Sequence, residues 1–376
     1  MGRRRPVVAG SAGGGTGMDP RVILSSALER DEIAPIEALI LMQEGETLLP
    51  ELQHVANELT HRLHHGRVSY VKSKSIHYTN ICRAECSFCP FWRKKGQRGA
   101  YTMSVEKVLR EIKAAPDVSV IELQGGLNPD LAFSYHLELV RAIRAQHPKL
   151  HIHAFSPAEI HFLARRSRMP AIEVLRQLQD AGLDSMPGTG AEVLNDKVRK
   201  KICPDKLRTA DWIDIVKTAH RLGIPTSATL MFGHVEDEIY LCEHLEILRN
   251  IQKETGGFTE FIPMPFIPDG SPLSHRNGHH RMIDEDRVLR MIAISRIFFN
   301  RTIPNIQANW LHLGFPNVLH SLGAGANDIG GLICADDAIH PASINGKRVL
   351  STDCVRQSVR RVGFIPGERD PLYRRM

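Results

Sequence analysis

Several features that define common protein classes are missing from this sequence of 376 residues. No apolar run approaches the length of about eighteen residues that a membrane-spanning helix needs, so we expect no membrane partner. No long basic run occurs, so the net charge of +6 does not indicate a nucleic-acid partner. Low-complexity blocks and short-period repeats are also missing from the body of the chain. We therefore expect a folded globular protein.

The first residues lack the features of an export signal. Arg3, Arg4 and Arg5 supply positive charge, but a Gly-rich stretch follows them where a signal needs an apolar region. We expect residues 1–19 to form a disordered tail. Seven cysteines are an odd number, and three of them lie between positions 82 and 89, which argues against a disulfide framework. This cysteine usage favours a reducing, cytoplasmic location.

The spacing of apolar residues changes along the chain. Residues 20–66 show helical spacing, and we expect them to form an N-terminal helical cap. From Val68 onward, short segments typical of strands alternate with amphipathic segments typical of helices. We expect strands over residues 75–78, 118–123, 151–155, 184–186, 226–232, 258–264, 305–308 and 326–329. We expect helices over residues 105–114, 135–145, 171–181, 210–221, 239–255, 285–299 and 316–321.

This alternation predicts an α/β fold. Repeating strand–helix units imply parallel strands, and eight such units can close into a (β/α) barrel of the TIM type. We expect residues 67–300 to form the core of this barrel and residues 301–376 to complete it. An open doubly wound sheet is the alternative, but no GxGxxG turn follows the first strand. In a barrel, the active site lies at the C-terminal ends of the strands.

Three cysteines follow the first expected strand with the spacing C-x3-C-x2-C, namely Cys82, Cys86 and Cys89. Thiolates are the ligands of iron–sulfur clusters, and a tight loop can direct three of them at one cubane, leaving one iron open. Two alternatives remain at this point. The three positions could form the buried face of a helix, because free cysteine packs as a small hydrophobe. They could also bind a structural zinc ion, with His77 as a fourth ligand.

The motif C-x3-C-x2-aromatic-C after the first strand of a (β/α) barrel resembles the signature of the radical S-adenosylmethionine (SAM) superfamily. The resemblance implies that Cys82, Cys86 and Cys89 bind a 4Fe-4S cluster whose open iron chelates SAM. It also implies that an electron from the cluster cleaves SAM to a 5′-deoxyadenosyl radical. Phe88 is then expected to lie beside the adenine.

Residues at later strand ends are candidates for the rest of this cofactor site. In the resemblance, the carbonyls of Gly125 and Gly126 receive the SAM amino group, although paired glycines are also common in β/α turns. Ser156 is expected at the cofactor site and as the N-cap of the following helix. Glu192 could accept hydrogen bonds from a ribose, and Arg199 could pair with a carboxylate. Both could equally be solvated helix residues.

Longer strings narrow the resemblance to one group within the superfamily. QGGLNPD, HAFSPAEI, TEFIPMPF and GANDIGG resemble the group of FO (deazaflavin) synthase subunit 2, aminodeoxyfutalosine synthase and cyclic dehypoxanthinyl futalosine synthase. GTGAE, TEFIPMPF and GANDIGG look most like the deazaflavin enzyme. That likeness implies a transferase of coenzyme F420 biosynthesis, which joins the 4-hydroxybenzyl fragment of L-tyrosine to 5-amino-6-(D-ribitylamino)uracil. The alternatives are a futalosine-pathway enzyme of menaquinone biosynthesis and, in another class, a metal-stabilised nucleic-acid-binding module.

Further strand-end side chains are candidates for the substrate site, and each could instead be structural at the barrel rim. The catalytic candidates are His234, Glu236 and Asn309, while Glu260, Phe266 and Trp310 add polar or stacking surface. The resemblance implies an aromatic or uracil-type substrate, an electron donor such as ferredoxin or flavodoxin, and a second radical SAM subunit that acts on the product. The remaining cysteines lack cluster spacing, and we expect them to be inert packing residues: Cys203, Cys242, Cys334 and Cys354.

Overall fold

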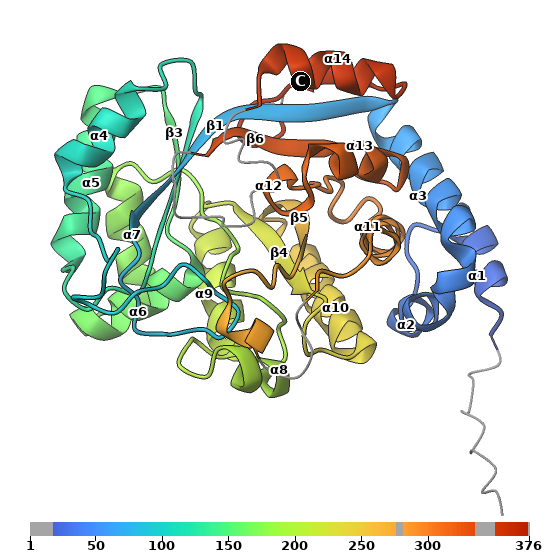
Figure 1. The fold of residues 1–376 in the computed structure, drawn as a ribbon, viewed down its shortest axis with the longest axis horizontal. Coiled ribbons are helices and arrows are strands. Elements are labelled where there is room, and N and C mark those ends of the chain that lie inside the picture. Colours follow the sequence, from blue (N-terminus) through green and yellow to red (C-terminus); the bar gives the residue numbers. More distant parts are fainter. Residues whose placement is uncertain (1–17, 276–280, 335–349, 375–376) are drawn as a thin grey trace, which may run out of the picture.

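Parallel strands form the centre of the computed structural model, which describes residues 18–275, 281–334 and 350–374 (Figure 1). The strands are β1 (Arg67–Thr79), β2 (Val120–Gly125), β3 (His151–Ala154), β4 (Thr226–Phe232), β5 (Phe258–Pro265), β6 (Asp328–Cys334) and β7 (Ile365–Glu368). The α-helices are α1 (Pro20–Ala27), α2 (Pro35–Glu44), α3 (Leu49–His64), α4 (Val105–Lys113), α5 (Phe133–Gln146), α6 (Pro157–Ser167), α7 (Ala171–Ala181), α8 (Asp196–Ile202), α9 (Thr209–Arg221), α10 (Glu238–Thr255), α11 (Glu285–Phe299), α12 (Trp310–Leu313), α13 (Phe315–Gly323) and α14 (Thr352–Arg361). Two short 3₁₀ helices are η1 (Gly45–Leu48) and η2 (Pro272–His275).

The strands close into a ring. One sheet has the order β3-β2-β1-β6, and β4 pairs with β5 in a second sheet. Four isolated parallel bridges join the two sheets: His153 with Ser185, Met186 with Thr226, Phe261 with Ile306, and Gln307 with Asp328. Six strands and the short segments at 185–186 and 306–307 therefore complete a closed barrel. The predicted TIM-type barrel is confirmed, and the open sheet is wrong.

Two expected strands are shorter in the structure, and one strand was not expected. The segments 184–186 and 305–308 form only single bridges, because Pro187 follows one and Pro304 precedes the other, and proline has no N–H to extend a ladder. β1 begins at Arg67 instead of near residue 75. Its first half pairs with the unexpected β7, in a register that places Arg67 opposite Ile365.

The N-terminal helical extension lies outside the barrel. Helices α1, α2 and α3 gather at one side of the molecule, and α3 packs against α11 (Figure 1). The division into a cap over 20–66, a core over 67–300 and a C-terminal region stays a prediction. Residues 1–17 of the expected tail lie outside the described residues. Where the chain is described, none of its helices combines the length and the apolar character that crossing a membrane requires.

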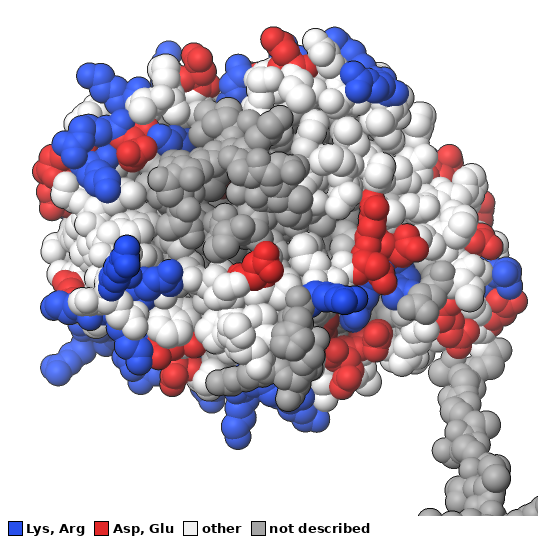
Figure 2. All heavy atoms as spheres, in the orientation of Figure 1, with Lys and Arg blue, Asp and Glu red and all other residues white. Residues whose placement is uncertain are grey.

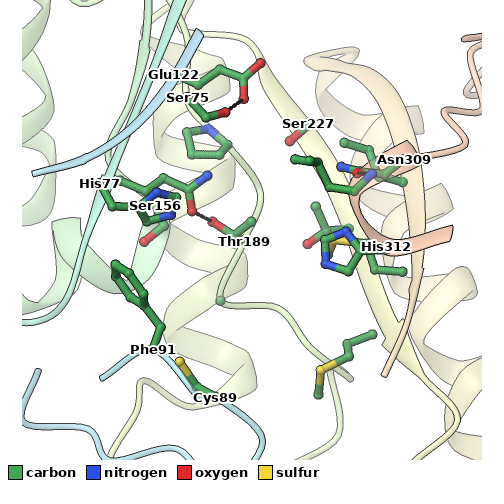
Figure 3. Close-up of a pocket in the computed structure, with 18 of the residues that line it drawn as sticks. Ser75, His77, Cys89, Phe91, Glu122, Ser156, Thr189, Ser227, Asn309 and His312 are labelled. Atoms are coloured by element: carbon green, nitrogen blue, oxygen red, sulfur yellow. Dashed lines mark hydrogen bonds between the residues drawn. The ribbon is translucent and has the colours of Figure 1, made fainter. Parts of the chain in front are cut away.

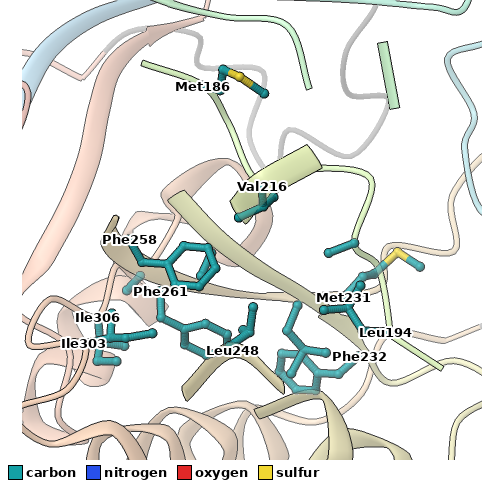
Figure 4. Close-up of a cluster of buried hydrophobic side chains, with 14 of the residues drawn as sticks. Met186, Leu194, Val216, Met231, Phe232, Leu248, Phe258, Phe261, Ile303 and Ile306 are labelled. Atoms are coloured by element: carbon teal, nitrogen blue, oxygen red, sulfur yellow. The ribbon is translucent and has the colours of Figure 1, made fainter. Parts of the chain in front are cut away.

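A cluster of apolar side chains fixes the positions of β4 and β5 (Figure 4). Phe232, Phe258 and Phe261 from these strands pack with Val216 of α9 and Leu248 of α10, and all five are at most 4% exposed. Burying each such side chain stabilises the fold by about 1.5–3 kcal/mol. Because side chains alternate along a strand, the neighbouring residues of β4 and β5 face the barrel interior.

A buried ion pair ties β6 to the segment after β7. The guanidinium of Arg369 donates to the Asp328 carboxylate at 2.6 and 3.3 Å. The same carboxylate also accepts hydrogen bonds from Ser69 of β1 and, at 2.8 Å, from the backbone N–H of Gly330. Asp328 is fully buried, so its charge depends on these donors.

We predict that Arg369→Met destabilises the protein strongly. The variant leaves the Asp328 carboxylate buried without its cation, and we expect the free energy of unfolding to fall by about 3–5 kcal/mol. Urea unfolding measures this change. Arg361→Met, at an exposed position in α14, is the matched control and should change stability by less than about 0.5 kcal/mol. Equal stability of the two variants would contradict the role assigned to the ion pair.

Candidate active site

The three motif cysteines lie on an irregular loop that follows β1. Hydrogen bonds to distant backbone fix its shape: the Ser87 N–H donates to the Ile202 carbonyl at 2.8 Å, and the Arg83 N–H donates to the Leu127 carbonyl at 3.1 Å. Glu85 has a left-handed backbone, with φ of 43°. The alternative that these cysteines form one face of a helix is therefore wrong.

One cavity of about 430 Å³ connects the cysteine loop with the barrel interior (Figure 3). Its lining includes the three cysteines and most of the expected cofactor-site residues: Cys82, Cys86, Cys89, Phe88, Gly125, Gly126, Ser156 and Glu192. They come from different strand ends, which a parallel barrel brings together at one rim. The structure therefore assembles these residues around one space.

The thiols suit a cluster better than a single ion. Among the described residues, no three His, Cys, Asp or Glu side chains are placed to share one metal ion, so the zinc alternative with His77 finds no ligand set there. In a cubane, each thiolate binds a different iron, so the three thiols need not converge on a single ion. Burial raises the pKa of Cys89, and a hydrogen bond with Cys203, together with burial, raises that of Cys86. Cluster binding must therefore displace the protons of these thiols.

Lys206 places a positive charge beside the cysteines. Its Nζ lies 2.5 Å from Glu192 Oε1 and 5.6 Å from the centre of the Phe88 ring. Burial opposes a charge on Lys206, but Glu192 and the thiols of Cys86 and Cys203 raise its pKa above the usual value. The side chain is therefore a cation at neutral pH, suited to offset the negative charge that thiolates bring. Lys206 was not predicted from the sequence, where it stands three positions after Cys203.

Cysteines outside the motif have different surroundings. Cys203 was expected to be inert, but its thiol is hydrogen-bonded to the Cys86 thiol, so it contacts one of the three motif cysteines directly. Cys242 is a packing residue whose thiol donates to the Pro35 carbonyl at 2.9 Å. Cys354 is exposed on α14. The side chain of Cys334 lies outside the described part.

Arg199 does not reach the cavity. Its side chain is buried, and its guanidinium donates to the backbone carbonyls of Ala191, Gly190 and Leu207, the last at 2.6 Å. These three acceptors occupy the donors that a ligand carboxylate would need. Arg199 therefore shapes the loop that carries Glu192, and Lys206 is the cation that lines the cavity near the cysteines.

A single carboxylate, that of Glu159, joins three elements of the site. Its Oε1 accepts from the Tyr78 hydroxyl at 2.6 Å and from the Gly125 N–H at 3.1 Å. Its Oε2 accepts from the N–H and the hydroxyl of Ser156 at 2.8 and 2.7 Å, in a capping box that begins α6. The predicted N-cap at Ser156 is confirmed. The spacing Ser-x-x-Glu was the sequence signal that would have identified Glu159.

Gly125 and Gly126 are needed for close packing. A Cβ atom on Gly125 would lie 2.5 Å from the ring of Tyr78. A Cβ atom on Gly126 would lie 2.4 Å from the Ile81 carbonyl oxygen and 2.8 Å from Cβ of Cys82. Any larger residue at Gly126 would therefore push the cysteine loop away from the second strand.

The expected catalytic residues separate in the structure. Asn309 lines the cavity, but His234 and Glu236 do not. These two side chains lie 3.0 Å apart in a turn before α10. Burial opposes the charge of Glu236, but the hydrogen bond from His234 helps to lower the pKa of Glu236 to about 2. Glu260 and Phe266 line the cavity, whereas Trp310 supports its wall through a 2.6 Å hydrogen bond from Nε1 to the Gly331 carbonyl.

The cavity also contains polar groups deeper in the barrel that sequence reasoning missed. Ser75, Glu122, His151, His153 and Arg369 line it. Their strands read as ordinary alternating segments, and only the closed ring shows that these side chains face a common space. Burial holds the pKa of His153 down at about 3, so its imidazole is neutral.

The comparisons with known proteins agree with this geometry. Residues 76–248 match the model of the radical SAM superfamily, and residues 255–376 match that of the CofH/MqnC C-terminal region. A barrel with three cysteines after its first strand is the architecture of radical SAM enzymes, whose cofactors are a 4Fe-4S cluster and SAM. The chain belongs to the radical SAM superfamily and to its CofH/MqnC branch.

Two archaeal relatives carry the same printed name, "5-amino-6-(D-ribitylamino)uracil--L-tyrosine 4-hydroxyphenyl transferase". The protein of Methanothermobacter thermautotrophicus is 39% identical, over 94% of this chain and 96% of its own length. That of Methanocaldococcus jannaschii is 37% identical, over 95% and 99%. This chain therefore spans nearly their whole length.

Solved structures share the fold at low sequence identity. Methylornithine synthase superposes with a TM-score of 0.71 at 17% identity, covering 92% of this chain and 97% of its own. The FeFe-hydrogenase maturase HydG from Carboxydothermus hydrogenoformans gives a TM-score of 0.73 at 18% identity, over 94% and 80%. At these identities the likeness concerns the fold alone.

We predict that Glu159→Gln is destabilising although it preserves shape. All four groups around this carboxylate are donors, so an amide NH₂ in place of one oxygen leaves donors without an acceptor. The free energy of unfolding should fall by about 2–4 kcal/mol, measured by urea unfolding. Asp180→Asn, the same chemical change at an exposed position of α7, is the control. A loss no larger than that of the control would refute the role of Glu159.

We also predict that Glu260 makes stability depend on pH. Burial raises its pKa from 4.5 to about 7, against the opposing effects of Arg369 and Thr259. The folded protein then holds a proton that the unfolded chain releases, so Glu260 reduces stability as pH rises from about 4.5 to about 7. At pH 8, the free energy of unfolding of Glu260→Gln should exceed that of wild type by up to about 3 kcal/mol. At pH 4.5 the two proteins should be almost equally stable. Thermal unfolding of both proteins across this range measures the difference, and a pH-independent difference would contradict the prediction.

Proposed function

We propose that this chain joins the 4-hydroxybenzyl fragment of L-tyrosine to 5-amino-6-(D-ribitylamino)uracil, in the pathway to coenzyme F420. The observation that carries the proposal is the name shared by relatives at 37–39% identity over nearly the whole chain. In this reaction the 5′-deoxyadenosyl radical takes a hydrogen atom from tyrosine and the Cα–Cβ bond breaks. The Cα part leaves as an imine, and the 4-hydroxybenzyl radical adds to the uracil, after which the adduct gives up one electron and one proton.

The cofactor site supports this reaction through residues of the chain itself. Cys82, Cys86 and Cys89 would hold the cluster, which when bound supplies the electron for reductive cleavage of SAM. Lys206 offsets negative charge at this end of the cavity. Gly126 lets the second strand end close to the cysteine loop, and Glu159 holds the turn in place. These residues would hold the cofactor in position when it is bound.

The enclosed barrel suits radical chemistry. A short-lived radical must meet its target before water or protein, so the substrates have to be held close and shielded. The cavity provides apolar wall from Met231, Met264 and Phe266, and hydrogen-bonding groups from Gln124 and Asn309. Such a mixture suits two substrates with flat rings and polar edges.

We further propose two protein partners and a cellular location for the enzyme. An electron donor such as ferredoxin or flavodoxin reduces the cluster, and a second radical SAM subunit takes over the product. The cytoplasm is the proposed location, in keeping with the free thiols of six described cysteines. A nucleic-acid-binding role has less support, because Lys and Arg are interspersed with Asp and Glu on the face that Figure 2 shows.

We predict the outcome of an activity panel with anaerobically reconstituted, reduced enzyme. Tyrosine with the ribitylaminouracil should give the coupled product and 5′-deoxyadenosine. The carboxyvinyloxybenzoate of menaquinone synthesis and dehypoxanthine futalosine should give no product, as measured by liquid chromatography with mass spectrometry. Turnover of either menaquinone precursor, with none of the tyrosine pair, would reject the proposal in favour of the futalosine enzymes.

Two cysteine variants test the cluster ligands independently of the choice of substrate. Cys82→Ala should lose the cluster, its absorption and all product, because one of the three ligands is missing. Cys354→Ala, at an exposed cysteine, should keep about four irons per chain and full activity. Iron loading equal in both variants would refute the ligand role of Cys82.

A further inference from the structure

The cavity does not end at the cofactor site but continues to a polar floor, which we define as Ser75, Glu122, His153, Ser227 and Glu260. In Figure 3, Ser75, Glu122 and Ser227 lie away from Cys89 along the cavity. TIM barrels usually fill this part of their interior with bulky branched side chains. Here the inward positions are small or polar, so they leave space and offer hydrogen bonds.

Strand register builds the floor. Ser75 of β1 lies opposite Glu122 of β2, which lies opposite His153 of β3. The Glu122 carboxylate accepts from the hydroxyls of Ser73 and Ser75 at 2.6 and 2.5 Å. Nδ1 of His153 is hydrogen-bonded to the hydroxyl of Ser185 at 2.7 Å. These contacts hold the polar groups in place around the space.

Glu260 is the floor residue that folding alone explains least. Its side chain is buried, and its hydrogen bond comes from Thr259, its neighbour in the chain. The nearby cation, Arg369, directs its guanidinium to Asp328. A buried carboxyl group is costly unless hydrogen bonds satisfy it, which indicates that a polar ligand completes this site.

We propose that the polar floor binds the polyhydroxylated ribityl chain of the uracil substrate. This inference rests on the proposed function and adds where that substrate lies. A hydroxyl group both donates and accepts, so a chain of hydroxyls matches a mixture of carboxyl, imidazole and serine groups. With the ribityl chain on the floor, the uracil ring lies nearer the cofactor end, where the new bond forms.

The charges of the floor argue against the amino acid as its occupant. Tyrosine carries both an ammonium group, which a glutamate of the floor could bind, and a carboxylate, which needs a cation that is free to pair with it. Arg369, the cation at this end, is already paired with Asp328. A neutral polyol needs no such cation. The tyrosine backbone therefore binds elsewhere in the cavity.

The test compares two uracils on the holoenzyme loaded with cluster and SAM, without reductant. The ligands are 5-amino-6-(D-ribitylamino)uracil and 5-amino-6-(methylamino)uracil, which lacks the hydroxyls, and calorimetry measures their affinities. Wild type should bind the ribityl compound at least about tenfold more tightly. Glu260→Gln should weaken the ribityl compound by about tenfold and leave the methyl compound unchanged. Its KM for tyrosine should change less than about twofold.

A second variant and a surface control accompany Glu260→Gln. Ser75→Ala removes one floor hydroxyl and should weaken only the ribityl compound, by about fivefold. Glu254→Gln, an exposed residue of α10 that pairs with Lys217, should leave both affinities as in wild type. Both cavity variants should keep the iron content of wild type, which shows that they fold and load the cluster.

Three outcomes would overturn the proposal. Equal affinity of wild type for the two uracils would show that the floor does not recognise the ribityl chain, even if the enzyme makes the coupled product. An increase in the KM for tyrosine in Glu260→Gln, with unchanged uracil affinity, would assign the floor to the amino acid. If wild type neither binds nor converts the ribityl compound, the proposed function itself fails, and the panel of menaquinone precursors reveals this separately.

Discussion

The buried carboxylate of Glu159 is the constraint on which the cofactor site depends. It accepts four hydrogen bonds from the end of β1, the end of β2 and the N-cap residue of α6. Each of these elements carries something that the site needs: the cysteine loop, the paired glycines and Ser156. Burial raises the pKa of Glu159, although the hydrogen bonds from Tyr78 and Ser156 oppose that shift. The buried carboxylate of Glu159 is thus stabilised by donors from the same elements whose relative positions the site requires.

The two ends of the cavity handle charge in opposite ways. Near the cysteines, Lys206 and Glu192 form a close pair, and the cation would balance the thiolates of a bound cluster. At the floor, Glu260 forms no ion pair with any of the described residues, and burial raises its pKa to about 7. The first arrangement is complete without substrate, whereas the second gains its partners when a ligand arrives. A cofactor that stays and a substrate that leaves place these different demands on the surrounding protein.

Sequence reasoning located the chemistry at strand ends but not the contacts between elements. The cysteine spacing and the strand–helix alternation are local signals, and both agree with the structure. Arg199 and Lys206 lie seven positions apart near one loop, and nothing local indicates which of them turns toward the cavity. His234 and Glu236 follow a strand end as expected, yet they are hydrogen-bonded to each other within the turn and do not face the cavity. The floor was missed because it depends on the register of five strands, which no single segment encodes.

The pairing of β7 with β1 has a consequence for how the chain assembles. Arg67 meets Ile365, so two segments from opposite parts of the sequence must come together before the lower edge of the barrel is complete. Contacts between segments so far apart in the sequence are typical of slow folding, because loop-closure entropy is lost before these contacts stabilise the chain. During synthesis the cysteine loop leaves the ribosome long before β6, β7 and Arg369, which close the barrel beneath it. A cluster inserted before β6 and β7 have paired with β1 would therefore meet a barrel that is still open on this side.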